Sequence, residues 1–377
     1  MQPMDTALHQ TLERVRAAVA DSSPLRIRGG GSKDFHALQL QGAILDTRSL
    51  HGIVSYEPSE LVVTVRAGTP LAELEAALAE QGQGLAFEPP HFAGVEGDVA
   101  TVGGMVAAGW SGPSRASVGA VRDFVLGIEI INGQAELLRF GGTVMKNVAG
   151  YDVSRLMAGS WGTLGLITEV SLKVLPVAPG EATLRFEGIS QAEALQHLNQ
   201  WGGQPLPLNA SCWVEDNGVG TLYVRLRGAV AAVEAACHNM GGTRMDAAQA
   251  APNWIACREQ TLPWFSARAA TDCLWRLSVP QTAPALALPA GVAAPLVEWH
   301  GGLRWVQAPR SMGATLKALA QQVGGSASLF RAESAGQISA EAIFDPQLAA
   351  MQRIHAQLKQ AFDPAGIFNP GRAMAQG

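Results

Sequence analysis

The stretch from Asp98 to Leu175 constrains this chain most, because it joins two glycine-rich segments to two apolar segments. The glycine-rich segments are residues 100–109 (ATVGGMVAAG) and 159–165 (GSWGTLG). Residues 124–131 and 164–174 are apolar and rich in β-branched side chains, which predicts strands. Glycine lets a main chain approach a ligand to hydrogen-bonding distance, because no Cβ stands between them. The pattern predicts a dinucleotide lying along these turns.

The composition fits a packed protein of two domains. The chain has 377 residues, of which 47% are hydrophobic and only 16% are charged. A net charge of −5 leaves no basic footprint, which argues against nucleic acid as the main partner. No apolar run is long enough to span a bilayer. Residues 1–21 carry Glu13 and a helical apolar period, so we expect no secretory signal and a cytoplasmic protein.

The cysteines are few and late in the chain. None of them pairs at the spacing of a metal site. We therefore expect free buried thiols, and no iron–sulfur cluster or other metal bound by this chain itself. They are Cys212, Cys237, Cys257 and Cys273.

A triple glycine follows the first predicted strand, Leu25 to Arg28. Successive backbone N–H groups in such a turn form an anion-binding concavity, to which Lys33 adds charge. The spacing matches neither a Walker A loop nor the Gly-x-Gly-x-x-Gly fingerprint. A phosphate site and a flexible surface turn both remain open for residues 29–33.

The segment from residue 61 to residue 91 continues a small α/β lobe. Residues 61–66 predict a strand, and residues 71–82 a helix with Thr69 as its N-cap and Pro70 in its first turn. His91 ends a rigid proline turn and is either a ligand contact or a solvated loop residue. Further along, Lys146 and Asn147 either reach a phosphate or carbonyl group or simply close a turn.

A change of character at residues 176–180 predicts a domain boundary. Beyond it, strands (183–186, 222–226, 275–279, 303–307) alternate with helices (190–201, 229–240, 311–323), which is typical of an α+β domain with an antiparallel sheet. Residues 346–362 predict an amphipathic helix. The closing FDPAGIFNPGR segment, 362–372, holds two prolines and two glycines, so we expect a defined path packed on another part of the molecule.

Residues 160–169 (SWGTLGLITE), preceded by 146–152 (KNVAGYD), resemble the signature of FAD-linked oxidases of the vanillyl-alcohol-oxidase/PCMH type. The triple glycine, the TVGG segment at 101–104 and the closing FDP and NPG segments stand where that family has its own versions. Within the family, the chain is similar to the smaller, E-type FAD-binding subunits of glycolate oxidases (glycolate dehydrogenases). The agreement spans residues 25–177 and the tail.

The resemblance implies an α+β protein. A PCMH-type FAD-binding domain of two α/β subdomains would span residues 1–178. An α+β cap domain with an antiparallel sheet would span 181–340, and a C-terminal helix and tail, 341–377, would pack back near the flavin site.

The resemblance also assigns a part of the cofactor to each glycine segment. The first loop would hold the pyrophosphate, residues 101–109 would lie along the ribityl chain and flavin, and residues 162–167 along the adenosine end. The implied FAD-binding residues are Arg28, Gly29, Gly30, Gly31, Ser32, Lys33, Pro89, Thr101, Val102, Gly103, Gly104, Ala107, Ala108, Gly109, Gly162, Gly165, Leu166 and Ile167.

Two departures from the family pattern carry predictions. Ser32 stands where members with covalent FAD have a histidine, and no cysteine lies near the second glycine segment, so we expect non-covalent, dissociable FAD. The histidine-rich substrate motif is reduced to Trp299-His300-Gly301-Gly302. His300 is therefore either the base that takes the hydroxyl proton or a packed or solvated residue.

The function implied is oxidation of glycolate, a small 2-hydroxy acid, to glyoxylate. Electrons would pass through flavin to an iron–sulfur partner subunit, beside a larger catalytic FAD subunit, because this chain cannot ligate clusters itself. The complex would lie in the cytoplasm or at the periphery of the inner membrane through its partners. Two alternatives stay open: a stand-alone FAD-dependent 2-hydroxy-acid dehydrogenase, and a structural subunit that FAD merely stabilises.

Overall fold

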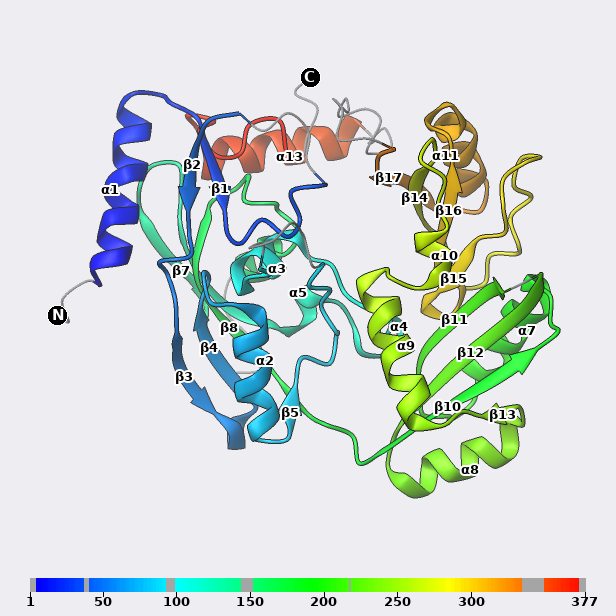
Figure 1. Ribbon diagram of the computed structural model, residues 1–377. Coiled ribbons are helices and arrows are strands. Elements are labelled where there is room, and N and C mark those ends of the chain that lie inside the picture. Colours follow the sequence, from blue (N-terminus) through cyan, green and yellow to red (C-terminus); the bar gives the residue numbers. More distant parts are fainter. Residues whose placement is uncertain are drawn as a thin grey trace. The chain divides into compact units, whose positions relative to one another are not determined.

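The computed structural model describes residues 5–36, 41–92, 99–143, 152–216, 218–333 and 349–372. The chain divides into two compact units (Figure 1). Unit 1 comprises Met1–Trp110, Ala120–Val177 and Pro346–Gly377, and unit 2 comprises Ser111–Gly119 and Ala178–Asp345. The expected first domain had included Ser111–Gly119, which belongs to unit 2. Helices and largely antiparallel sheets occur in both units, so the predicted α+β class is confirmed.

Unit 1 is built on a five-stranded antiparallel sheet in the order β3-β4-β8-β6-β7. The predicted strands at 124–131 and 164–174 are two of its three interior members, β6 and β8. Helices α2 (Leu71–Glu80) and α3 (Val102–Ala108) accompany it. The strands are β3 (Ile53–Glu57), β4 (Val62–Arg66), β6 (Val125–Ile131), β7 (Leu137–Gly141) and β8 (Leu166–Lys173).

A second layer of unit 1 contains the parallel pair β1 (Leu25–Arg28) and β2 (Ala43–Asp46). Helix α1 (Thr6–Ala20) covers this pair, and Asp5 caps the helix by accepting the backbone N–H of Ala7 at 3.0 Å. The apolar face of α1 packs with the pair and with Phe368 of the tail. The N-terminal and C-terminal segments therefore share one core.

Helix α2 begins where its sequence predicts, but its N-terminus differs. Leu71, Leu74 and Leu78 are fully buried on one face, as their spacing requires. Pro70, not Thr69, is the N-cap residue. The Thr69 hydroxyl instead accepts the backbone N–H of Gly52 at 2.9 Å, so the predicted cap was wrong because a tertiary partner occupies that side chain.

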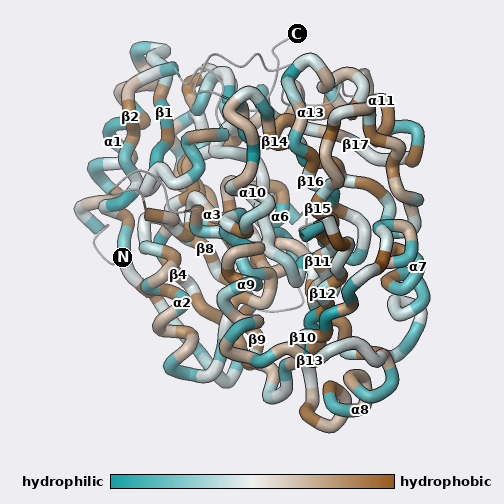
Figure 2. Tube along the Cα trace, turned by 45° about the vertical axis from the view of Figure 1, so that its right-hand side comes forward, coloured by the Kyte–Doolittle hydropathy of each residue, from teal (hydrophilic) through white to brown (hydrophobic). Residues whose placement is uncertain are grey.

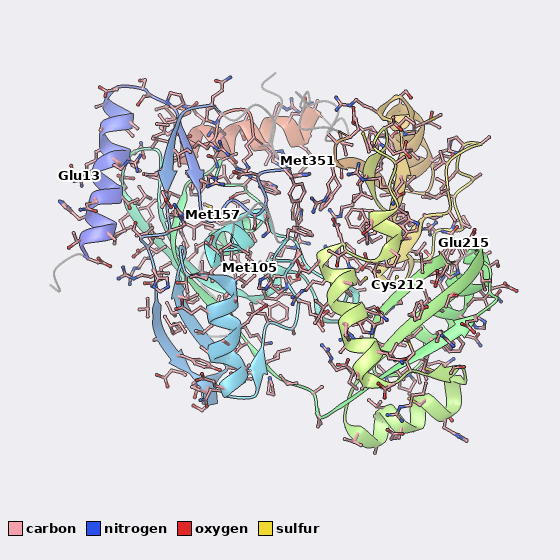
Figure 3. The ribbon with its side chains drawn as sticks, in the orientation of Figure 1. Glu13, Met105, Met157, Cys212, Glu215 and Met351 are labelled. Carbon is pink, nitrogen blue, oxygen red and sulfur yellow. The ribbon has the colours of Figure 1, made fainter. Side chains whose placement is uncertain are left out.

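Short elements complete unit 1. Met105 on α3 and Met157, just after the short helix α6 (Val153–Leu156), are almost fully buried; both are labelled in Figure 3. They fix α3 and the following turn within the core. The short elements are η1 (Pro58–Glu60), β5 (Gln83–Gly84), α5 (Val121–Phe124), α6 (Val153–Leu156) and β9 (Leu175–Pro176). The long helix α13 (Ala349–Phe362) lies in the C-terminal region.

Unit 2 is organised by an eight-stranded antiparallel sheet in the order β13-β10-β12-β11-β15-β16-β14-β17. The expected antiparallel sheet is therefore present. Its strands are β10 (Gly180–Glu187), β11 (Leu208–Asp216), β12 (Val219–Gly228), β13 (Thr243–Arg244), β14 (Cys273–Ser278), β15 (Leu296–Glu298), β16 (Leu303–Ala308) and β17 (Ser326–Arg331). Figure 3 marks Cys212 and Glu215 on β11.

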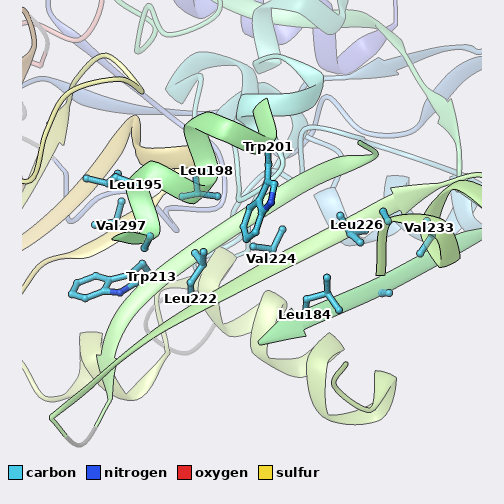
Figure 4. Packing of buried hydrophobic residues seen from close by; sticks show 13 residues of the cluster. Leu184, Leu195, Leu198, Trp201, Trp213, Leu222, Val224, Leu226, Val233 and Val297 are labelled. Carbon is cyan, nitrogen blue, oxygen red and sulfur yellow. The ribbon is translucent and has the colours of Figure 1, made fainter. Parts of the chain in front are cut away.

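Two apolar clusters hold α7 (Gln191–Gly202), α8 (Val230–Met240) and α11 (Gly313–Gln322) on this sheet. In one, Trp201 of α7 and Trp213 of β11 lie beside Leu222 and Val224 of β12 (Figure 4). Hydrophilic and hydrophobic residues alternate along α7 (Figure 2), as expected for a helix with one buried face. The helices are α4 (Arg115–Val118), α7 (Gln191–Gly202), α8 (Val230–Met240), α9 (Ala247–Glu259), α10 (Pro263–Ser266), η2 (Trp299–Gly301), η3 (Arg310–Met312) and α11 (Gly313–Gln322).

Within the described ranges, no helix has both the length and the apolar character needed to cross a bilayer.

Candidate functional site

The triple-glycine loop follows β1 directly and packs on residues 99–101. A Cβ on Gly29 would lie 2.4 Å from the Thr101 hydroxyl oxygen, and one on Gly30 would lie 1.6 Å from the Val99 carbonyl oxygen. A side chain at either position would collide with residues 99–101, so packing within the protein itself requires glycine here. The sequence pattern alone offers only a ligand or a flexible turn as the reason for these glycines.

The backbone of this loop is free to bind an anion. Gly31 has a φ of 82°, which turns the chain in a way that glycine adopts without strain. No described residue accepts a hydrogen bond from the backbone N–H of Gly30, Gly31 or Ser32. Neighbouring unpaired N–H groups at a turn of this kind form an anion-binding concavity.

Helix α3 presents its small residues to two different neighbours. Its N-cap Thr101 accepts the backbone N–H of Gly104 at 3.3 Å. A Cβ on Gly103 would lie 2.7 Å from the Ala67 Cβ, so this glycine packs against the protein. A Cβ on Gly104 would lie 3.0 Å from the Thr101 hydroxyl oxygen, and the space around it is otherwise open. Gly104 and Ala107, one turn apart, line the cavity described below.

The turn after Met157 is fixed to the end of α3. The backbone N–H of Trp161 donates to the Ala107 carbonyl at 2.8 Å. Gly109, which ends α3, would place a Cβ 2.9 Å from the Gly159 backbone, so the two segments touch. Trp161 and Gly162 both have positive φ, 55° and 69°, which turns the chain sharply before β8 begins.

The C-terminal tail joins the two glycine segments. Asn369 accepts the backbone N–H of Ile27 and donates to the carbonyl of Trp161, both at 2.7 Å. Phe368 forms a parallel bridge with Leu25 of β1. The expected defined path of the tail is therefore present, and it ends with Arg372 beside the first loop.

One solvent-open cavity lies among these segments, and its described lining comes entirely from unit 1. It brings together most of the predicted cofactor residues, whose role toward FAD stays a prediction. Those lining it are Arg28, Gly29, Gly30, Gly31, Ser32, Lys33, Thr101, Gly103, Gly104, Ala107, Gly162, Gly165 and Ile167.

Five predicted residues do not line the cavity. Val102 and Ala108 are buried positions of α3. Leu166 precedes Ile167 on β8 and so faces the opposite side of the sheet, where it joins the core with α1. Gly109 serves the packing just described, and Pro89 is buried elsewhere.

Three further residues had been weighed as ligand contacts: His91, Lys146 and Asn147. His91 contacts the Glu75 carboxylate at 2.9 Å, and it does not line the cavity. Lys146 and Asn147 lie outside the described residues.

Sequence reasoning missed several lining residues that lie inside motifs it had singled out. Trp161 belongs to the SWG segment, and Asn369 and Arg372 belong to the NPGR segment. The firm path predicted for the tail was the signal that could have brought the last two into the site. Asp34, directly after Lys33, was also missed.

Positive charge prevails at the loop end of the cavity. Asp34 accepts hydrogen bonds from Arg26 and Arg28, each at 2.7 Å. Arg372 is a third guanidinium near the same carboxylate, and burial lowers its pKa to about 10, so it stays charged at neutral pH. Lys33 is also buried beside the loop. The excess of cations over this one carboxylate suits an anionic ligand.

In unit 2, His300 lies between two serine hydroxyls. Its Nδ1 is 3.1 Å from Ser211 Oγ, its Nε2 is 3.0 Å from Ser117 Oγ, and its backbone N–H donates to Ser211 Oγ at 2.9 Å. Burial lowers the pKa of His300 to about 4, so the ring is neutral at neutral pH. Both Trp299 and His300 have left-handed φ angles, 53° and 54°. This is a strained backbone, which persists only where its surroundings determine it.

Two guanidiniums flank the neighbouring indole. The Cζ atoms of Arg115 and Arg276 lie 4.4 Å and 5.2 Å from the ring of Trp299. Burial, together with the charge of Arg115, lowers the pKa of Arg276 to about 10. The indole nitrogen of Trp299 donates to the Gly112 carbonyl at 3.0 Å, which ties the segment 111–119 to unit 2.

Comparison with known proteins identifies the family. The family model described as FAD binding domain matches residues 8–141, and that described as FAD linked oxidases, C-terminal domain, matches residues 341–373. Glycolate oxidase subunit GlcE of Escherichia coli (strain K12) is 45% identical over 365 residues, which cover 97% of each chain. The chain belongs to this family of FAD-linked oxidases. FAD is therefore its cofactor, and oxidoreduction its class of chemistry.

Other relatives match a smaller part or only the fold. Glycolate oxidase subunit GlcD of Bacillus subtilis (strain 168) is 33% identical over 153 residues, 40% of this chain and 32% of that protein. A solved structure of alkyldihydroxyacetonephosphate synthase has a TM-score of 0.67 at 15% identity, covering 96% of this chain and 74% of its own. That likeness concerns the fold, and it agrees with the expected PCMH-type architecture.

The shape and charge of the cavity suit FAD, independently of the comparison with relatives. Unpaired N–H groups and an excess of cations meet the needs of a pyrophosphate. Gly104 and Ala107 leave room along α3 for a bulky group. The described lining contains no histidine, cysteine or tyrosine, and dissociable binding of FAD stays a prediction.

Proposed function

We propose that this chain is the FAD-binding subunit of a complex that oxidises glycolate to glyoxylate and passes the electrons to an iron–sulfur partner. The observation that carries the proposal is the cavity formed by the triple-glycine loop, α3, the turn at 161–167 and the tail. It occurs in a chain that is 45% identical, over 97% of its length, to a glycolate oxidase subunit.

Each wall of the cavity has a proposed part in holding FAD. The N–H groups of Gly30, Gly31 and Ser32 would hold the pyrophosphate. Gly104 and Ala107 would lie along the ribityl chain and flavin, and residues 162–167 along the adenosine end. Bound FAD supplies an acceptor for the two electrons that leave the hydroxyl-bearing carbon of a 2-hydroxy acid.

His300 is the proposed acceptor of the substrate's hydroxyl proton. Its low pKa keeps the ring unprotonated and able to accept a proton at neutral pH, although it makes the ring a weak base. Both ring nitrogens contact serine hydroxyls, so Nε2 would have to give up Ser117 to reach a substrate.

The partners are proposed from what this chain does not supply. Two-electron flavin chemistry that feeds one-electron carriers needs clusters. Among the described residues, no three side chains of His, Cys, Asp or Glu gather as a metal site would require. Cys257 instead contacts Glu298 at 3.1 Å, and Cys273 contacts Glu333 at 2.7 Å. The proposed complex adds a larger catalytic FAD subunit and an iron–sulfur subunit, in the cytoplasm or at the inner membrane's periphery.

A stand-alone 2-hydroxy-acid dehydrogenase is the second candidate. It is favoured by His300, which lies between two serine hydroxyls and next to Trp299, whose ring two arginines flank. A structural subunit stabilised by FAD would use the same open space at Gly104 and the same unpaired loop N–H groups, so it differs from the first two candidates in its chemistry and not in its cavity.

The visible spectrum of the FAD-loaded chain, followed under anaerobic conditions, separates the three. Bleaching by glycolate or D-lactate in the isolated chain would support the stand-alone enzyme. Bleaching only after both partner subunits are added would support the complex. A chain with bound FAD that never bleaches, even in a complex that turns over, would leave only a structural role.

A further inference from the structure

The side chain of Arg372 is buried, and no described residue forms a hydrogen bond with it. It is only 9% exposed, and its Nε is fully enclosed with no acceptor among the described residues. Its guanidinium stacks on the Trp161 ring, with Cζ 5.0 Å from the ring centroid. No described carboxylate forms an ion pair with it. A buried cation in this state is unfavourable unless something else meets its donors.

The surrounding structure holds Arg372 in that position. Asn369, three residues earlier, is bonded to both walls of the cavity, and the backbone N–H of Arg372 donates to the Asn369 carbonyl at 3.2 Å. Asp363 further upstream accepts the N–H groups of Ile367 and Phe368 at 3.1 Å and 2.9 Å. The tail therefore delivers the guanidinium to the cavity lining as a fixed group.

A ligand that binds this guanidinium must be an anion. The nearest carboxylate, Asp34, already forms ion pairs with Arg26 and Arg28. The formal negative charges of oxidised FAD lie on its pyrophosphate, while its flavin and adenine rings are neutral. Arginine presents a fork of donors that matches phosphate oxygens. The free N–H groups of the glycine loop line the same cavity.

We propose that Arg372 is a binding residue for the pyrophosphate of FAD, and that the C-terminal tail, residues 363–372, thereby forms the fourth wall of the cofactor site. This rests on the proposed placement of FAD in the cavity. It assigns a binding role to a residue that stands more than 200 positions after the last glycine segment.

The test compares FAD and ADP, which share the pyrophosphate but not the flavin, by titration of the cofactor-free full-length chain. Arg372→Gln should weaken both ligands by a similar factor, roughly 10- to 100-fold, as loss of a charge-assisted bond predicts. Arg372→Lys should fall between, because lysine keeps the charge but not the fork. The matched control is Arg353→Gln on the exposed part of α13, which removes the same charge and should leave both affinities unchanged.

Three outcomes would overturn the proposal. One is wild-type affinity of Arg372→Gln for FAD. The second is a loss for FAD without a loss for ADP, which would move the contact to the flavin. The third, decisive if the glutamine variant fails to fold, is a folded Arg372→Lys protein with wild-type affinity for both ligands. Wild-type protein that binds FAD in none of these titrations would instead overturn the proposed function.

Discussion

The side-chain carbonyl of Asn369 accepts a hydrogen bond from the backbone N–H of Ile27 at 2.7 Å, across 342 positions of sequence. Ile27 lies on the strand that leads into the triple glycine. The amide group of the same side chain donates to the carbonyl of Trp161, in the other glycine segment. One residue of the tail thus sets the spacing of two walls of the cavity.

Replacement of Asn369 by alanine should weaken both the fold and FAD binding. Two side-chain hydrogen bonds would be lost, which lowers the free energy of unfolding by about 1 to 3 kcal/mol. Urea unfolding and FAD titration measure the two effects. Asn199→Ala, which removes one bond to the Leu195 carbonyl in unit 2, should leave the FAD affinity unchanged. Unchanged FAD affinity in Asn369→Ala would show that the tail does not position the site.

Gly104→Val should fold but fail to take up FAD. Its side chain would enter open space on the cavity side of α3, where the cofactor is placed. Gly103→Val is the informative contrast, because its side chain would collide with Ala67 and should lower the melting temperature of the apoprotein. Stoichiometric FAD in folded Gly104→Val protein would rule out this placement of the flavin.

Asp363→Ala should release the tail. The carboxylate is fully buried and accepts Lys359 Nζ at 2.6 Å as well as two backbone N–H groups. Removing it leaves buried donors unpaired, for an expected loss of about 3 kcal/mol. Asp246→Ala, which removes an exposed helix cap, should lower stability by only about 1 kcal/mol. Thermal melting and limited proteolysis of the C-terminus compare the two; equal losses would contradict the assigned role of Asp363.

Stability should fall with acid between about pH 6.5 and pH 4 because of His300. Burial lowers its folded-state pKa to about 4, below the ordinary 6.5, so in this window the unfolded chain binds the proton more readily. The contribution of His300 to the free energy of unfolding is complete above pH 6.5. It is lost as the pH falls toward 4, and the loss is at most about 3 kcal/mol. Urea unfolding at several pH values, repeated with His300→Gln, isolates it. An identical pH slope in the variant would mean that His300 titrates normally.

Local patterns predicted much of the framework. The strand at Leu25–Arg28 was predicted with its observed bounds, and the central strands of the unit 1 sheet to within two residues at each end. These segments are apolar and bounded by glycine, so burial and local preference agree. In unit 2, β11 was missed because Asn209, Ser211 and Glu215 dilute its apolar run, and α9 because it contains Pro252.

The site was only partly predictable, because its closure depends on long-range pairing. The glycine motifs pointed to the cavity, but several of those glycines, such as Gly30 and Gly103, are required by contacts with the protein's own backbone and side chains. Arg372 carries no periodic signal and joins the site only through the bonds of Asn369 to distant segments. Likewise, nothing in the local sequence of Ser111–Gly119 tells which unit it joins.

The account's central claim is that the backbone of three distant segments, closed by the tail, holds one dissociable FAD. The direct measurement saturates the purified chain with FAD, removes the excess, precipitates the protein with acid and quantifies the flavin on both sides. We expect one FAD per chain, all of it in the supernatant. A chain that retains no FAD, or a pellet that stays yellow, would contradict the account.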